Sequence, residues 1–143
     1  MMVMVHGACH CGAIAYEAGI DPARVTVCHC MDCQTISGSA FRLSVPVPGS
    51  AFKMTGQPAT YIKTAESGNR REQGFCPKCG SPIYSTTPGP GPKESYMLRV
   101  GILRQRDRLN PKLQIWTRSA RPWLARLSDI PKNETQQGTS HLR

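Results

Sequence analysis

The chain has 143 residues, of which 39% are hydrophobic and 19% charged, and its 18 basic and 9 acidic residues give a formal net charge of +9. A chain of this length forms one core, so we expect one domain rather than two. No apolar run approaches the roughly 20 residues of a membrane-spanning helix, and residues 1–7 lack the basic and apolar regions of a secretory signal. We therefore expect no membrane partner and a cytoplasmic location, where thiols are free or metal-bound.

The apolar runs are short, rich in Val, Ile, Tyr and Phe, and interrupted by Gly or Pro, which predicts a mainly β chain. Strands are expected over residues 12–18, 24–27, 41–47, 52–55, 59–63, 71–75, 82–86, 95–102 and 112–116. A short helix is expected over residues 31–36, ended by Gly38, and a second one after Pro122. The folded domain should cover residues 1–130, and the polar segment 131–143 should be a disordered tail.

The basic excess is concentrated between Arg99 and Arg126, where eight basic residues stand against Asp107 alone. Such a run is typical of a nucleic-acid surface, a solvated face or a site for a small anion. Because the run lacks an aromatic stacking series, we expect a solvated face or a small-anion site rather than nucleic-acid binding. Two late tryptophans, Trp116 and Trp123, are expected to close the core.

Seven cysteines form the most informative pattern. They are Cys9 and Cys11, then Cys28, Cys30 and Cys33, then Cys76 and Cys79. An odd number in a cytoplasmic chain argues against a disulfide framework, and these spacings are typical of metal ligands. The segment Cys76-Pro-Lys-Cys79-Gly80 has the form of a zinc-ribbon knuckle, which is half of a tetrahedral site. Spacing leaves open whether the first pair or two members of the central group complete it, and a redox dithiol at Cys76 and Cys79 is the alternative.

The central group has a geometry of its own. On an extended strand, Cys28 and Cys30 face the same way and His29 faces the opposite way, and a turn into a helix brings Cys33 round to the other two thiols. If a separate site takes the other four cysteines, this metal has three protein ligands and one open position, the pattern of catalytic zinc. His29 is the rival fourth ligand, but we expect it to form a hydrogen bond outside the ligand set.

Three segments carry a family pattern. They are Gly-Ala-Cys-His-Cys-Gly-Ala-Ile at residues 7–14, Cys-His-Cys-Met-Asp-Cys-Gln at residues 28–34 running into Ser-Gly-Ser-Ala-Phe at residues 37–41, and Phe-Cys-Pro-Lys-Cys-Gly-Ser-Pro-Ile-Tyr at residues 75–84. In order, spacing and flanking residues, the chain resembles the glutathione-dependent formaldehyde-activating enzyme family, which includes the centromere protein V type domains. The resemblance extends over roughly residues 5–125.

The resemblance implies a β-tent zinc-binding fold of several short antiparallel sheets with one or two short helices. It implies two zinc ions per chain. A structural zinc would be held by Cys9, Cys11, Cys76 and Cys79. A second zinc would be held by Cys28, Cys30 and Cys33, which are then the catalytic residues. Family members are described as joining glutathione to formaldehyde, a carbon–sulfur lyase activity.

Three hypotheses about function follow. The first is an enzyme that binds a small thiol such as glutathione at the open zinc and forms its adduct with formaldehyde or a related carbonyl, or releases it, with arginines binding the carboxylates of the thiol. The second is a non-catalytic zinc module that binds an acidic partner or nucleic acid through its basic C-terminal part. The third is a thiol redox protein. A homodimer is compatible with each of them.

Overall fold

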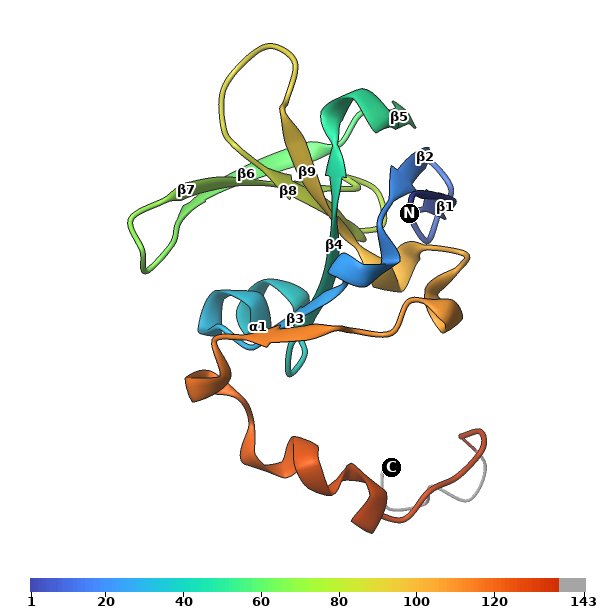
Figure 1. Ribbon diagram of the computed structural model, residues 1–143, viewed down its shortest axis with the longest axis vertical. Helices are drawn as coiled ribbons and strands as arrows, with labels where there is room; N and C mark the ends of the chain where they lie inside the picture. The colour runs from blue at the N-terminus through green and yellow to red at the C-terminus, as the bar shows by residue number, and fades with distance from the viewer. Residues whose placement is uncertain (137–143) are drawn as a thin grey trace.

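The computed structural model describes residues 1–136, which form ten strands in two sheets and one α-helix (Figure 1). The expected mainly β class is confirmed. Of the expected tail, residues 137–143 lie outside the described residues, and residues 131–136 carry neither helix nor strand. The boundary of the domain at residue 130 stays a prediction.

The smaller sheet has three antiparallel strands in the order β1-β2-β5. They are β1 (Val3–Ala8), β2 (Ala15–Ile20) and β5 (Phe52–Thr55). Strand β1 was not among the expected strands because its buried face ends at Gly7, a weak strand former. The structure shows why glycine stands there, since a Cβ at Gly7 would lie 2.4 Å from the ring of Tyr16 on the paired strand.

The larger sheet has seven strands in the order β10-β3-β4-β9-β8-β7-β6. They are β3 (Thr26–Cys28), β4 (Arg42–Pro48), β6 (Ala59–Thr64), β7 (Arg70–Phe75), β8 (Pro82–Thr86), β9 (Ser95–Arg99) and β10 (Leu113–Ile115). Neighbouring strands are antiparallel except that β10 runs parallel to β3. Residues far apart in the chain therefore meet on one sheet face.

The expected helix is α1 (Met31–Ser37), one residue longer than predicted. Cys30 caps its N-terminus, and Gly38 ends it with φ of 66°, a conformation that favours glycine. The second expected helix is a 3-10 segment over Pro122–Asp129, kinked at Arg126. Shorter 3-10 turns lie at Pro22–Arg24, Gly49–Ala51, Val100–Ile102, Arg106–Arg108 and Thr117–Ser119. Among the described residues, no helix is long and apolar enough to span a membrane.

The core lies between the two sheets. Its fully buried side chains include Val5, Ile20, Val45, Ile83 and Leu98. These residues come from β1, β2, β4, β8 and β9, so the smaller sheet packs on the middle of the larger one. Each such side chain contributes about 1.5–3 kcal/mol of transfer free energy. This packing holds the loops between the strands in place.

The expectation that the two tryptophans close the core was wrong. Trp116 is 36% exposed and Trp123 is 45% exposed. The aromatic part of the core is instead a chain of rings with centroids 4.6–6.3 Å apart, formed by Tyr16, Phe52, Tyr84 and Tyr96. Trp116 directly follows β10, which pairs with β3, and lines a surface cavity.

Candidate metal centres

The first cysteine cluster joins two turns that lie far apart in the sequence. Cys9 and Cys11 lie between β1 and β2, and Cys76 and Cys79 lie between β7 and β8. All four sulfurs lie within 4.8 Å of one another. The Cys9–Cys11 and Cys11–Cys76 sulfur distances are both 3.7 Å, and a tetrahedron with metal–sulfur bonds of about 2.3 Å has edges of about 3.8 Å. The four sulfurs thus match a closed tetrahedral site.

Backbone amides point at the sulfurs of this four-cysteine cluster. The amide of Ile14 donates to Cys9 Sγ at 3.2 Å, and the amide of Cys79 donates to Cys76 Sγ at 3.5 Å. The side chain of Ser81 lies 3.2 Å from Cys79 Sγ, and this hydrogen bond, followed by backbone amides, lowers the pKa of Cys79 to about 5. Although the backbone amide of Ala13 lowers it, burial and hydrogen bonds to the neighbouring thiols raise the pKa of Cys11 to about 11. A thiol with a lowered pKa, such as Cys79, favours metal binding at neutral pH.

The second cluster forms where β3 runs into α1. Cys28 ends the strand, Cys30 caps the helix, and Cys33 lies in its first turn, with the three sulfurs within 4.8 Å of one another. The amide of Cys33 donates to Cys30 Sγ at 3.2 Å. Within the cluster, a hydrogen bond between Cys28 and Cys33 lowers the pKa of Cys28 and raises that of Cys33, which burial raises further. The structure thus brings together the three thiols that the strand and turn pattern predicted to meet.

The three-cysteine cluster opens into a cavity of about 440 Å³ on one face of the larger sheet. Its basic lining residues are Lys63, Arg42, Arg71 and Arg99. No acidic residue is among the described residues that line this cavity. Ile115 and Trp116 form an apolar wall beside the thiols. This three-cysteine cavity therefore suits a small ligand with negative charge.

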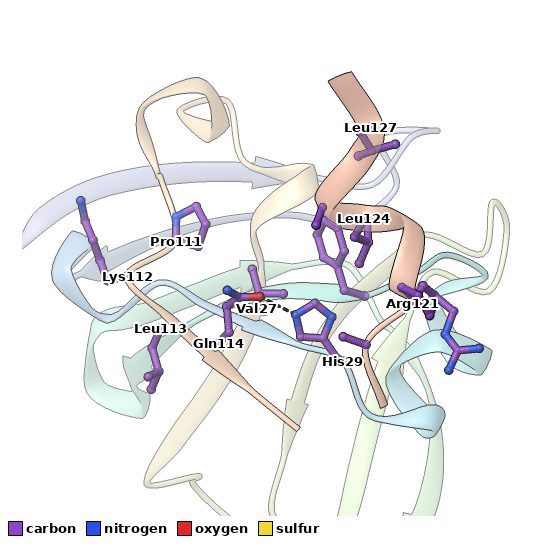
Figure 2. A pocket seen from close by; sticks show the side chains of 13 residues that line it. Val27, His29, Pro111, Lys112, Leu113, Gln114, Arg121, Leu124 and Leu127 are labelled. Atoms are coloured by element: carbon purple, nitrogen blue, oxygen red, sulfur yellow. Dashed lines mark hydrogen bonds between the residues drawn. The ribbon is translucent and has the colours of Figure 1, made fainter. Parts of the chain in front are cut away.

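His29 takes no part in the three-cysteine cluster. It is absent from the residues that line the three-cysteine cavity and lines a separate cavity of about 880 Å³, together with Leu113, Leu124 and Leu127 among others (Figure 2). Its ring is almost fully buried, and Nε2 lies 2.7 Å from Gln114 Oε1 on β10. This agrees with the expected hydrogen bond outside the ligand set. It also leaves the three-cysteine cluster without an imidazole ligand.

The expected basic region does not form one surface. Arg99 is buried in the three-cysteine cavity, whereas Arg104, Arg106 and Arg108 are exposed elsewhere. The other basic residues of this cavity are Arg42, Lys63 and Arg71, which lie on β4, β6 and β7. The sequence analysis did not identify these three residues. Arg42 and Ser44 stand two residues apart on β4 and therefore lie on the same face of the strand. Two polar residues at such positions are the sequence signal that could have indicated a polar cavity on this face.

Comparison with known proteins gives the family. The model of the glutathione-dependent formaldehyde-activating enzyme family matches residues 4–119. The chain belongs to this family. Membership confirms the resemblance drawn from the three cysteine segments, all of which lie within the matched residues. No curated protein matched the chain.

A solved structure supports the fold. The crystal structure of a Rhodobacter sphaeroides protein superimposes with a TM-score of 0.56 at 21% identity, covering 76% of this chain and 98% of that chain. At this identity the likeness is one of fold.

Proposed function

We propose that the chain is a zinc-dependent carbon–sulfur lyase that adds a small thiol, such as glutathione, to formaldehyde or a related small carbonyl, or releases it. One observation carries the proposal: one cluster offers four cysteines, whereas the other offers three and faces a cavity. Three protein ligands and an open position are typical of catalytic zinc, and four are typical of structural zinc. Membership of the family supports the choice of substrates.

Zinc is the ion that suits these donors. Every side chain in both clusters is a thiol, and soft thiolate ligands at tetrahedral spacing favour zinc or iron–sulfur chemistry. We infer two zinc ions per chain, one for each cluster. When bound to Cys28, Cys30 and Cys33, zinc would supply a Lewis acid that keeps a thiol ionised at neutral pH, where a free thiol with a pKa of about 8.5 is mostly protonated.

The residues of this chain would orient the reactants. The three cysteines would place the thiol sulfur at the base of the cavity, and Ile115 and Trp116 would cover one side of it. In the addition, the thiol gives its proton to water, a carbon–sulfur bond forms at the carbonyl carbon as the carbonyl π bond breaks, and the carbonyl oxygen takes one proton back from water, so that no net proton is gained or lost. Release follows the same steps in reverse. The chain holds the sulfur and the carbonyl in one place, which lowers the entropic part of the barrier.

Thiol-dependent consumption of formaldehyde tests the proposal. Zinc-loaded protein, glutathione and formaldehyde are mixed, and the hydroxymethyl adduct is followed by NMR against the uncatalysed reaction. We expect acceleration by the native chain and none by Cys33→Ser. An unaccelerated reaction with glutathione and with other small thiols would reject the enzyme and leave the non-catalytic zinc module as the better reading.

A further inference from the structure

The cavity of about 880 Å³ beside His29 shares no lining residue with the three-cysteine cavity, and we call it the His29 cavity. Figure 2 shows Leu113 on one side of it, Leu124 and Leu127 on the other, and His29 between them. None of the described residues that line it is a cysteine. Its volume falls within the range of cavities that enclose small organic molecules. It is therefore a candidate binding site of its own.

One wall of the His29 cavity lies beyond the residues that match the family model, which end at residue 119. This wall is the chain from residue 120 to residue 127, which includes most of the 3-10 segment Pro122–Asp129. Its lining residues are Ala120, Arg121, Pro122, Leu124, Ala125 and Leu127. The cavity is therefore a feature of this chain that the family match does not account for.

His29 brings an unpaired hydrogen-bond acceptor to this cavity. The residue is only 3% exposed, and its Nε2 lies 2.7 Å from Gln114 Oε1. Because an amide oxygen only accepts, Nε2 carries the proton and Nδ1 of the neutral ring is an acceptor. Nδ1 is buried without a hydrogen-bond partner among the described residues. A buried acceptor without a donor costs free energy, so the ring indicates a ligand that carries a donor hydrogen.

The charges of the lining favour a neutral donor. Lys112 and Arg121 line the cavity and no acidic residue is among the described lining residues, which disfavours a cationic ligand. A carboxylate has acceptors only and would leave Nδ1 unpaired. A hydroxyl group supplies the donor hydrogen without a charge, which suits the apolar side chains that form most of the lining.

An aromatic ring suits the rest of the cavity better than an alkyl chain. Phe41 lines the cavity, and its ring meets that of His29 edge to face with centroids 6.0 Å apart. A further ring gains from such contacts, and its face attracts cations such as Lys112 and Arg121. A phenol joins this ring to a hydroxyl that is a strong donor, because its pKa of about 10 makes it more acidic than an alcohol.

We propose that the His29 cavity binds a small hydrophobic phenol, whose hydroxyl donates to His29 Nδ1 and whose ring lies between Leu113 and Leu124. No residue of the segment Pro122–Asp129 is buried, and Leu127 is 50% exposed. The segment is therefore able to move outward and let the hydroxyl reach Nδ1. The site is independent of the proposed function, because it involves neither cysteine cluster.

Two probes of nearly equal shape test the site by calorimetric titration into the zinc-loaded chain. They are 4-propylphenol and its methyl ether, 4-propylanisole, which lacks the donor hydrogen. The phenol should bind at least about fivefold more tightly, because the ether leaves Nδ1 unpaired. Equal affinity for the two probes, or tighter binding of 4-propylbenzoate than of the phenol, would overturn the proposed ligand class. Binding of none of them would overturn the site.

Substitutions on the outer wall then locate the binding. Leu127 and Ile130 are 50% and 51% exposed and three residues apart, but only Leu127 lines the cavity. Leu127→Glu should weaken binding of 4-propylphenol by about tenfold, because it removes apolar contact area. Ile130→Glu is the matched control and should change the affinity by about twofold or less. Circular dichroism verifies folding, and an equal loss in the two variants would contradict the assignment.

Nitrogen NMR of the imidazole rings tests the hydrogen bond in the native chain. It needs no substitution at His29, which stands between two cysteines of the three-cysteine cluster. Contacts between ring protons of His29 and Phe41 assign the signal. The phenol should shift the Nδ1 resonance of His29, and the ether should leave it in place. No shift with the phenol, or an equal shift with both probes, would contradict the hydrogen bond.

Discussion

The four-cysteine and three-cysteine clusters use the same side chain in different surroundings. The first lies in two turns that join strands of both sheets, with Cys9 and Cys76 buried in the core. The second lies at a strand-to-helix junction and opens into a basic cavity. Under the proposed function, the number of ligands and the access to a cavity, rather than the chemistry of the ligand, would distinguish the structural metal site from the site that takes a substrate.

The largest expected effect concerns folding. Cys79→Ser should leave the chain unfolded or strongly destabilised, because structural zinc binding contributes about 10–16 kcal/mol and a domain has only about 5–15 kcal/mol of net stability. Cys33→Ser is the matched control and should melt within a few degrees of the native chain. Thermal melting by circular dichroism measures both. Equal destabilisation would remove the distinction between the two clusters.

The second effect concerns chemistry. Cys28→Ser, Cys30→Ser and Cys33→Ser should each reduce thiol-dependent consumption of formaldehyde to the uncatalysed rate while the protein stays folded. Each change removes one of the three ligands that would hold the metal ion to which the substrate thiol binds. Initial rates from NMR, with folding verified by circular dichroism, provide the measurement. Full activity in any one of these variants would show that its thiol is not a ligand of the catalytic centre.

Acid should separate the clusters by the pH at which they lose metal. Cys79 has a pKa lowered to about 5, so its thiolate stabilises the folded state above its unfolded pKa of about 8.5 and loses this contribution as the pH falls through about 5. The pKa of Cys11 in the same cluster is raised to about 11, and in the three-cysteine cluster the pKa of Cys33 is raised and that of Cys28 lowered, so the order of release follows from the number of ligands, four against three. A zinc-sensitive dye should therefore report release in two steps, the first from the three-cysteine cluster.

The control for this titration is Cys33→Ser. It should lack the first step and retain the second. Release of both ions in one step, or an earlier release from the four-cysteine cluster, would contradict the expectation that four cysteines hold the metal more tightly than three.

The smallest effect concerns the sheet that supports the four-cysteine cluster. Gly7→Ala places a Cβ 2.4 Å from the ring of Tyr16, two residues before Cys9, and should destabilise the fold by about 1–3 kcal/mol. Gly19→Ala is the control, since the nearest atom there is 3.6 Å away. Denaturant unfolding measures both. The three-cysteine cluster should retain its activity in folded Gly7→Ala, since Gly7 lies on the other sheet.

Local features could be predicted from the sequence. Alternation along residues 28–30 placed two thiols on one side and His29 on the other, and the cavity around His29 agrees with this. Glycine at position 38 ended the helix within one residue of its observed end. Spacing alone left the partner of the Cys76 pair open, because that choice depends on contacts between distant turns.

Features that depend on strand order could not be predicted in the same way. Arg42, Arg71 and Arg99 come together because β4, β9, β8 and β7 are neighbours in the sheet, an order that differs from the order in the chain. The parallel pairing of β10 with β3 likewise places Trp116 beside the cysteines instead of in the core. Periodicity identifies a strand but not its neighbours.

A cobalt-substituted chain titrated with glutathione tests the central claim most directly, namely that the three-cysteine cluster has an open position for a thiol. Cobalt bound to both clusters gives thiolate-to-metal absorption, and we expect added glutathione to change it in the native chain. Cys33→Ser, which retains the four-cysteine cluster, should show no such change. An absorption spectrum that stays unchanged in the native chain, with both clusters occupied by cobalt, would contradict the account.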